Sequence, residues 1–116
     1  MDDFELLTMR PNLAVRNVAV AAAFYRDVLG FRVTTTFDDG SFALLHGGGA
    51  ELALVRDDAP SPQGAYLYVR GVEALHARCE VAGAKVVYSL TDEPWGLRNF
   101  VVEDPDGHRI AIGERI

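Results

Sequence analysis

The sequence has little cysteine, few basic residues and no long apolar run, and each shortage argues against a class of protein. Cys79 is its single cysteine, so no intrachain disulfide can form and a cytoplasmic location is expected. Lysine and arginine total 11 against 17 aspartates and glutamates, and the net charge of −6 argues against nucleic acid or membrane as a partner. The longest apolar run, residues 18–25, is far shorter than the roughly 20 residues of a membrane span. Residues 1–5 lack the basic and apolar pattern of a signal peptide.

The composition that remains is typical of one globular domain. A chain of 116 residues has the size of a single domain, and its 49% hydrophobic and 24% charged residues are sufficient for a buried core. Residues 18–29 predict a helix, with Asn17 as its N-cap and Gly30 where a helix-ending glycine is favoured. Apolar residues at i, i+4 and i+8 predict its buried stripe, namely Val20, Phe24 and Val28.

Strand-like segments surround this helix, and the pattern returns in the second half. In the first half they span residues 10–16, 31–37, 40–46 and 50–56, with turn signals at 38–40 and 47–49. A polar linker with two prolines follows at residues 57–63. In the second half, residues 64–70, 85–90, 98–103 and 108–114 predict strands and residues 72–82 predict a helix. We therefore predict a single domain, 1–116, made of two modules at 9–56 and 64–114.

The two halves also resemble each other residue by residue. Leu-Ala-Val-Arg-Asn-Val at residues 13–18 aligns with Leu-Tyr-Val-Arg-Gly-Val 54 positions later. Leu-Gly-Phe-Arg-Val at residues 29–33 aligns with Ala-Gly-Ala-Lys-Val 53 positions later. Two matches at a nearly constant offset, each with the same order of elements, indicate an internal duplication.

Two segments resemble the modules of a known superfamily. Residues 12–18 lead into Ala-Phe-Tyr-Arg-Asp-Val-Leu-Gly-Phe at 23–31, and Pro94-Trp95-Gly96 is followed by Arg98 and by Glu-Asp-Pro-Asp-Gly-His at 103–108. Both resemble the vicinal oxygen chelate superfamily, which includes glyoxalases, bleomycin-resistance proteins and dioxygenases. The resemblance spans residues 9–114 and implies an α+β fold. In that fold two βαβββ modules form a curved mixed sheet around a cleft, within a homodimer.

The resemblance also raises the question of a metal. Enzymes of this superfamily hold one divalent ion through four side chains on the inner sheet faces, whereas its bleomycin-resistance proteins bind a ligand without a metal. The four positions fall at Arg10, Glu51, Gly64 and Ala111. Only Glu51 can bind a metal, because arginine is a permanent cation and glycine and alanine have no donor side chain. We therefore expect no metal and no other cofactor.

The remaining reactive side chains do not rebuild a catalytic site. We expect His46, His76 and His108 to be solvated or associated with turns, and Cys79 to be a small core residue of the second helix. No serine has an evident partner base, and the glycines at 47–49 lack the helix and lysine of a phosphate-binding loop. No catalytic residue is assigned.

Alternation along the strands predicts which residues face the cleft. If the four metal positions of the family face it, so do the residues two positions away, and the inward set is Arg10, Asn12, Ala14, Glu51, Ala53, Tyr66, Tyr68 and Ala111. The opposite parity is uniformly aliphatic, as a face packed on helices should be: Leu13, Val15, Leu52, Leu54, Leu67, Val69, Ile110 and Ile112. The inward set combines aromatic and polar side chains, which is typical of ligand pockets.

Three further contacts follow from the resemblance to bleomycin-resistance proteins, in which a Trp-Gly segment and another aromatic residue stack on the ligand. Trp95 and Phe42 are the corresponding candidates here, and Arg98 is a third. The alternative is that Trp95 caps the end of the barrel and the tyrosines fill its interior. We also hypothesise that Arg10 pairs with Glu51 as a buried pair that organises the site; the alternative is that Arg10 points to solvent.

Three functions are consistent with these residues. The first is a metal-free protein that binds a small molecule and sequesters an antibiotic or a metabolite. The second is a superfamily enzyme, a lyase, isomerase or dioxygenase, with a non-standard site. The third is a structural or regulatory dimer without a ligand. Missing metal donors weigh against the second, and the aromatic and polar inner face weighs against the third.

Overall fold

The computed structural model describes residues 3–116, and both halves of the chain follow the order βαβββ. The first half contains β1 (Asn12–Val15), α1 (Val18–Asp27), β2 (Arg32–Thr36), β3 (Phe42–Gly47) and β4 (Ala50–Arg56). The second half contains β5 (Gly64–Tyr68), α2 (Val72–Val81), β6 (Lys85–Glu93), β7 (Leu97–Glu103) and β8 (Arg109–Arg115). The predicted α+β class is confirmed. Neither helix of residues 3–116 is long and apolar enough to cross a membrane.

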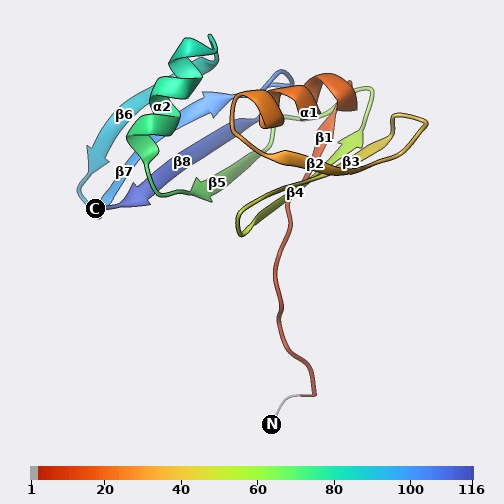
Figure 1. Cartoon of the computed structure of the whole chain (residues 1–116), viewed down its shortest axis with the longest axis horizontal. Helices are drawn as coiled ribbons and strands as arrows, with labels where there is room; N and C mark the ends of the chain where they lie inside the picture. The colour runs from red at the N-terminus through yellow and green to blue at the C-terminus, as the bar shows by residue number, and fades with distance from the viewer. Residues whose placement is uncertain (1–2) are drawn as a thin grey trace.

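Each half forms its own four-stranded mixed sheet. The strand orders are β1-β4-β3-β2 and β5-β8-β7-β6, so the two sheets have the same topology. In each sheet the first strand runs parallel to its neighbour, and the other pairs are antiparallel. Both helices lie on the same side of the two sheets, which sit side by side and leave their other faces open (Figure 1). Because β1 and β5 stand at one end of their strand orders, they are edge strands.

The apolar stripe predicted for α1 is right in part: Phe24 and Val28 pack against the core, but Val20 does not. Asn17 is the N-cap as expected, since its side chain accepts a hydrogen bond of 3.0 Å from the Val20 backbone N–H. Val20 itself is 53% exposed, whereas the helix buries Val18, Ala21, Ala22 and Tyr25. This segment is apolar nearly all round, so spacing alone could not decide which stripe faces the sheet. Tyr25 decides it, because its hydroxyl has a buried partner in the second half.

The N-terminus of α2 is capped by a residue from the far end of the chain. Gly71 precedes the helix in a left-handed conformation (φ +84°) and has no capping side chain. The Glu114 carboxylate of β8 instead accepts hydrogen bonds from the backbone N–H groups of Gly71 and Val72, both at 3.1 Å. These two donors hold the pKa of Glu114 below its ordinary value. Sequence patterns near residue 71 do not reveal this cap, because the capping group lies 43 residues away.

The buried face of the sheets is the one that strand alternation predicted. Six of the eight aliphatic residues are no more than 4% exposed: Leu13, Val15, Leu52, Leu54, Ile110 and Ile112. Leu67 of β5 and Val69, just after it, are only partly buried, because α2 packs against β6, β7 and β8. The helix-side face of β5 is therefore left beside the space between the two halves.

A buried hydrogen bond joins the two halves. The Tyr25 hydroxyl of α1 donates to Asp104 Oδ2 at 2.6 Å, and the two residues are 1% and 5% exposed. Asp104 Oδ1 accepts from the backbone N–H groups of Asp106 and His108, which shapes the turn between β7 and β8. Burial, together with the neighbouring carboxylate of Asp104, raises the pKa of Tyr25. Tyr25 therefore stays a protonated donor at neutral pH.

His108 strengthens the same junction. Of its two predicted alternatives, solvated or associated with a turn, the second holds, because His108 is fully buried and its backbone N–H donates to Asp104 in the β7–β8 turn. Its Nδ1 accepts from the Gln63 backbone N–H at 2.8 Å, so Nε2 carries the proton and donates to the Ala14 carbonyl at 2.6 Å. The Gln63 side chain also accepts from the Ala14 backbone N–H at 3.1 Å. The β7–β8 turn therefore holds β1 beside the second half.

Candidate ligand-binding cleft

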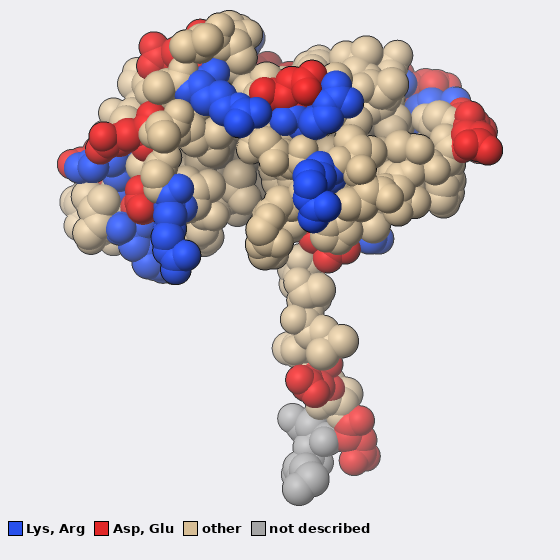
Figure 2. All heavy atoms as spheres, viewed as in Figure 1, with Lys and Arg blue, Asp and Glu red and all other residues tan. Residues whose placement is uncertain are grey.

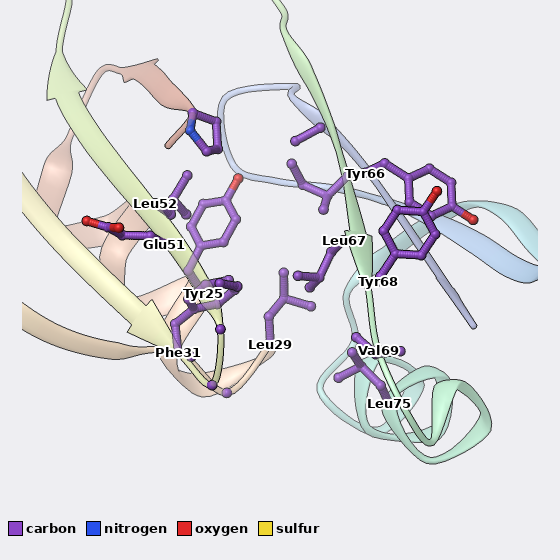
Figure 3. Close-up of a pocket in the computed structure, with 18 of the residues that line it drawn as sticks. Tyr25, Leu29, Phe31, Glu51, Leu52, Tyr66, Leu67, Tyr68, Val69 and Leu75 are labelled. Atoms are coloured by element: carbon purple, nitrogen blue, oxygen red, sulfur yellow. The ribbon is translucent and has the colours of Figure 1, made fainter. Parts of the chain in front are cut away.

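A cavity of about 1100 Å³ lies between the two halves. From the first half it is lined by Leu29, Phe31 and the turn from β3 to β4, and from the second half by β5 and Leu75. Leu29 and Leu67 point toward each other across it (Figure 3). The same hollow is open on the surface (Figure 2). Its size and apolar walls suit a drug-sized organic ligand.

Two tyrosines form an aromatic platform on the other face of β5. Tyr66 and Tyr68 project from the side of this strand opposite to Leu67, and the cavity wraps around the strand to reach both (Figure 3). Their ring centroids are 4.8 Å apart, and the two residues are 39% and 56% exposed. The guanidinium carbon of Arg115 lies 4.9 Å from the Tyr68 centroid, a cation–π distance. We call these two rings the tyrosine platform.

The Tyr66 ring rests against β8 and covers an asparagine. A Cβ atom on Gly113 would lie 2.9 Å from Tyr66 Cζ, so only glycine leaves room for the ring there. The Tyr66 hydroxyl accepts a hydrogen bond of 2.9 Å from Asn99 Nδ2. Asn99, on β7, is 9% exposed, and its Oδ1 is buried without a hydrogen-bond partner. A buried polar atom of this kind is uncommon in folded proteins.

Polar side chains cross the open face of the first sheet, one on each of three strands and one just before β1. Arg10 Nη1 lies 3.8 Å from Glu51 Oε1 on β4, and His46 Nε2 on β3 lies 3.5 Å from the same oxygen. Thr34 of β2 hydrogen-bonds His46 Nδ1 at 2.9 Å, and Arg32 is the cross-strand partner of His46. We call Arg10, Glu51, His46 and Arg32 the polar row. The hypothesised pair of Arg10 and Glu51 is therefore present.

Two details of that pair differ from expectation. It is partly exposed and not buried, with Arg10 and Glu51 side chains 37% and 27% exposed, because the open face of the sheet has no covering layer. His46, which we expected to be solvated or associated with the turn, also lies beside Glu51, so three side chains meet here instead of two. Antiparallel pairing places His46 directly opposite Glu51, and this register was not part of the sequence prediction.

The other predicted contacts are dispersed. Asn12 shares the open face with the polar row through its register opposite Ala53. Phe42 lies at the far end of β3 and packs on Phe37, with centroids 4.9 Å apart. Trp95 is 65% exposed in the turn between β6 and β7. Among residues 3–116, those that line the cavity include Glu51, Tyr66 and Tyr68 but none of these three.

Arg98 lies on the helix-side face of its sheet, opposite to the face that carries the tyrosine platform. Its guanidinium is held by Asp92 at 2.6 and 3.0 Å and by Glu73 of α2 at 2.6 Å. Arg98 is adjacent to Asn99 on β7, and adjacent strand residues point to opposite faces, so it faces the helix. Asp92 is the largest cause of the raised pKa of Arg98. The structure does not bring Arg98 together with the tyrosine platform.

A model of the Glyoxalase/Bleomycin resistance protein/Dioxygenase superfamily matches residues 8–112. The chain belongs to this superfamily. A bleomycin resistance protein of Geobacillus stearothermophilus is 28% identical over 134 aligned positions, covering 96% of this chain and 98% of that protein. An uncharacterized protein of Mycobacterium tuberculosis is 41% identical over 56 residues, covering 48% of this chain. The match spans only 33% of that mycobacterial protein's length.

Solved structures of the superfamily share the fold. TioX from Micromonospora sp. ML1 superposes with a TM-score of 0.84 at 27% identity, covering 93% of this chain and 98% of TioX. A lactoylglutathione lyase from Agrobacterium tumefaciens superposes with a TM-score of 0.81 at 21% identity, covering 93% and 92%. The superfamily therefore includes proteins of different function on one fold, and the fold alone does not choose among them.

The residues at the superfamily's metal positions do not fit a divalent ion. Of the four, only Glu51 has a donor, and the Arg10 guanidinium lies 3.8 Å from it. Gly64 and Ala111 present no side-chain donor. Across the described part of the chain, no three histidine, cysteine, aspartate or glutamate side chains are placed to hold a metal ion. The described residues therefore do not form the metal site of the superfamily's enzymes.

Sequence reasoning missed Asn99 and His46, and it also missed Arg32 of the polar row and Arg115 beside Tyr68. Asn99 and His46 lie on strands, β7 and β3, for which the sequence-based prediction did not work out which residues face the cleft. Asn99 pairs with Gly113, two residues beyond Ala111, so the alternation argument extended across β7 would have placed it inward. His46 would have followed in the same way from its register with Glu51.

Proposed function

We propose that this chain binds a small organic molecule in the cleft, and that binding needs no metal. The observation that carries the proposal is the exposed tyrosine platform beside a cavity of about 1100 Å³. Aromatic faces bind planar or cationic groups by stacking, and Arg115 beside Tyr68 extends the stacking surface. Arg10 stands where the superfamily's enzymes need a metal donor, which weighs against their chemistry here.

The relatives indicate which ligands to test first. Bleomycin resistance proteins align over nearly the whole chain, so antibiotics with flat aromatic groups are the first class. Binding of such a molecule would sequester it, and the polar row would contact its polar groups. The cytoplasmic location expected from the single cysteine suits this role and stays a prediction.

We also propose that the protein acts as a homodimer. Residues 3–9 extend away from the body of the molecule (Figure 1), and Phe4, Leu6, Leu7 and Met9 are 70–91% exposed. Apolar side chains so fully exposed in one segment favour a covering partner. Analytical ultracentrifugation should give twice the chain mass at micromolar concentration; a monomer there would contradict this part of the proposal.

A thermal-shift screen tests the function. Metal-stripped protein is heated with bleomycin, other planar aromatic antibiotics and, separately, divalent cations. At least one organic compound should raise Tm in a saturable way, because a ligand that binds only the folded state stabilises it by mass action. Stabilisation by a divalent ion, with stoichiometric metal in the purified protein, would support a superfamily enzyme instead. Flat responses throughout would support a dimer without ligand.

A further inference from the structure

We propose that Tyr66 is a movable cover over Asn99, and that the Asn99 carboxamide recognises an amide group on an aromatic ligand stacked on Tyr68. This inference rests on the proposed function and names the class of ligand. It concerns Asn99, at the base of the tyrosine platform, whose backbone belongs to the sheet and whose side chain hydrogen-bonds Tyr66.

The first support is the unsatisfied carboxamide. Asn99 is nine-tenths buried, its Nδ2 donates to the Tyr66 hydroxyl, and its Oδ1 has no partner. Turning the amide over would pair Oδ1 with the hydroxyl and leave Nδ2 unpaired, so Tyr66 satisfies one end in either orientation. A ligand amide satisfies both, since its N–H donates to Oδ1 while its carbonyl accepts from Nδ2.

The second support is the way in which Tyr66 is held. Tyr66 is 39% exposed and lies on the edge strand β5, so solvent borders part of the ring and leaves it room to rotate. Its other side rests on the bare backbone at Gly113. The hydrogen bond to Asn99 is the specific contact that closes the cover, and the Tyr68 ring lies beside it, with centroids 4.8 Å apart.

The chemistry selects the ligand class. The site offers two neutral aromatic faces and one carboxamide, with a guanidinium already engaged on Tyr68. A planar bicyclic aromatic group that carries a primary amide matches these features, because one of its N–H groups lies on the same side as its carbonyl. The corresponding ester lacks the N–H donor, so it would leave Asn99 Oδ1 unpaired. Sites built to hydrogen-bond a ligand N–H reject analogues without it strongly.

Two fluorescent naphthalene probes that differ only in the group on the carbonyl, an amino or a methoxy group, test the inference: 2-naphthamide and methyl 2-naphthoate, titrated into the full chain. Wild type should bind the amide at least about tenfold more tightly than the ester. Asn99→Leu, which keeps the volume and removes both polar atoms, should reduce that ratio to about one. Tyr66→Phe should tighten amide binding about fivefold, because the hydroxyl no longer competes for Asn99.

Tyr88→Phe is the matched control, because it removes a tyrosine hydroxyl on the same sheet that donates to Glu93 and not to Asn99. It should leave both affinities unchanged. Circular dichroism checks the fold of Asn99→Leu, and Tyr66→Phe tests the cover with Asn99 intact. An unchanged amide-to-ester ratio in Asn99→Leu, or weaker amide binding in Tyr66→Phe, would overturn the inference. Failure of wild type to bind either probe would also overturn it, whereas the antibiotic screen decides the proposed function separately.

Discussion

The buried hydrogen bond between Tyr25 and Asp104 gives the sharpest stability prediction, because it joins the two halves that form the cleft. Tyr25→Phe keeps the ring and removes only the hydroxyl. Asp104 then loses the single donor to Oδ2, while Oδ1 keeps the backbone N–H groups of Asp106 and His108. The carboxylate is 5% exposed, so water cannot replace the lost donor.

The magnitude follows from the charge of the acceptor. A hydrogen bond to a charged group contributes about 1.5–3 kcal/mol, and the cost of leaving a buried acceptor without its donor falls in the similar range of about 1–3 kcal/mol. We therefore expect Tyr25→Phe to lower the free energy of unfolding by about 2 kcal/mol. For a domain of this size that corresponds to a fall in Tm of roughly 8 °C.

Urea denaturation followed by circular dichroism measures this change, with the m-value as a check that the unfolding transition is unaltered. Tyr88→Phe is the control, because it removes an exposed hydroxyl that donates to Glu93 at 2.7 Å. That exposed contact should contribute less than about 0.5 kcal/mol. Equal costs for the two variants, or a cost below about 0.5 kcal/mol for Tyr25→Phe, would refute the reasoning that this bond fixes the junction.

Three further predictions concern the helix cap, the cysteine and the polar row. Glu114→Gln should lower Tm at pH 7; since N–H donors lower the folded-state pKa of Glu114, wild type should lose its advantage as pH falls below the ordinary value of 4.5. Cys79 is buried and burial raises the pKa of its thiol, so it should react with a thiol reagent such as DTNB only in denaturant; fast labelling of native protein would contradict this. Glu51→Gln should cost less than about 1 kcal/mol in urea denaturation, because Arg10 and His46 remain hydrated; a cost of several kcal/mol would mean that the row is buried.

Much of the fold could be predicted from local signals. β4 has the predicted bounds, residues 50–56, because glycines end the preceding strand and a charged segment follows. Gly30 ends α1 with a positive φ of 85°, as its place in the sequence suggested. Each of these depends on neighbours within a few residues. The bend of β6 past residue 90 and the face of α1 depend on distant partners and could not be predicted.

The site was predictable where strand alternation could be anchored to a motif. Glu51, Tyr66 and Tyr68 were placed inward in this way and line the cavity, but Leu52, Leu67, Val69 and Ile110, predicted on the opposite face, line it as well. Asn99 depends on the register between β7 and β8, and His108 on the packing of a turn against the other half. Contacts between elements far apart in the chain leave no local pattern in the sequence. Arg98 was assigned from its motif alone, without the face of its strand being considered. It lies on the helix side of the sheet, where it contacts Glu73 of α2.

Binding to the tyrosine platform without a metal is the central claim, and calorimetry tests it most directly. The antibiotic that most stabilises wild type in the screen, with bleomycin tested first, is titrated into metal-stripped wild type and into Tyr68→Ala. We predict one site per chain in wild type, unaffected by EDTA. Tyr68→Ala loses the stacking surface and the Arg115 contact, so it should bind the antibiotic at least about tenfold more weakly than wild type. Binding that needs an added divalent ion, or that Tyr68→Ala leaves unchanged, would contradict the claim.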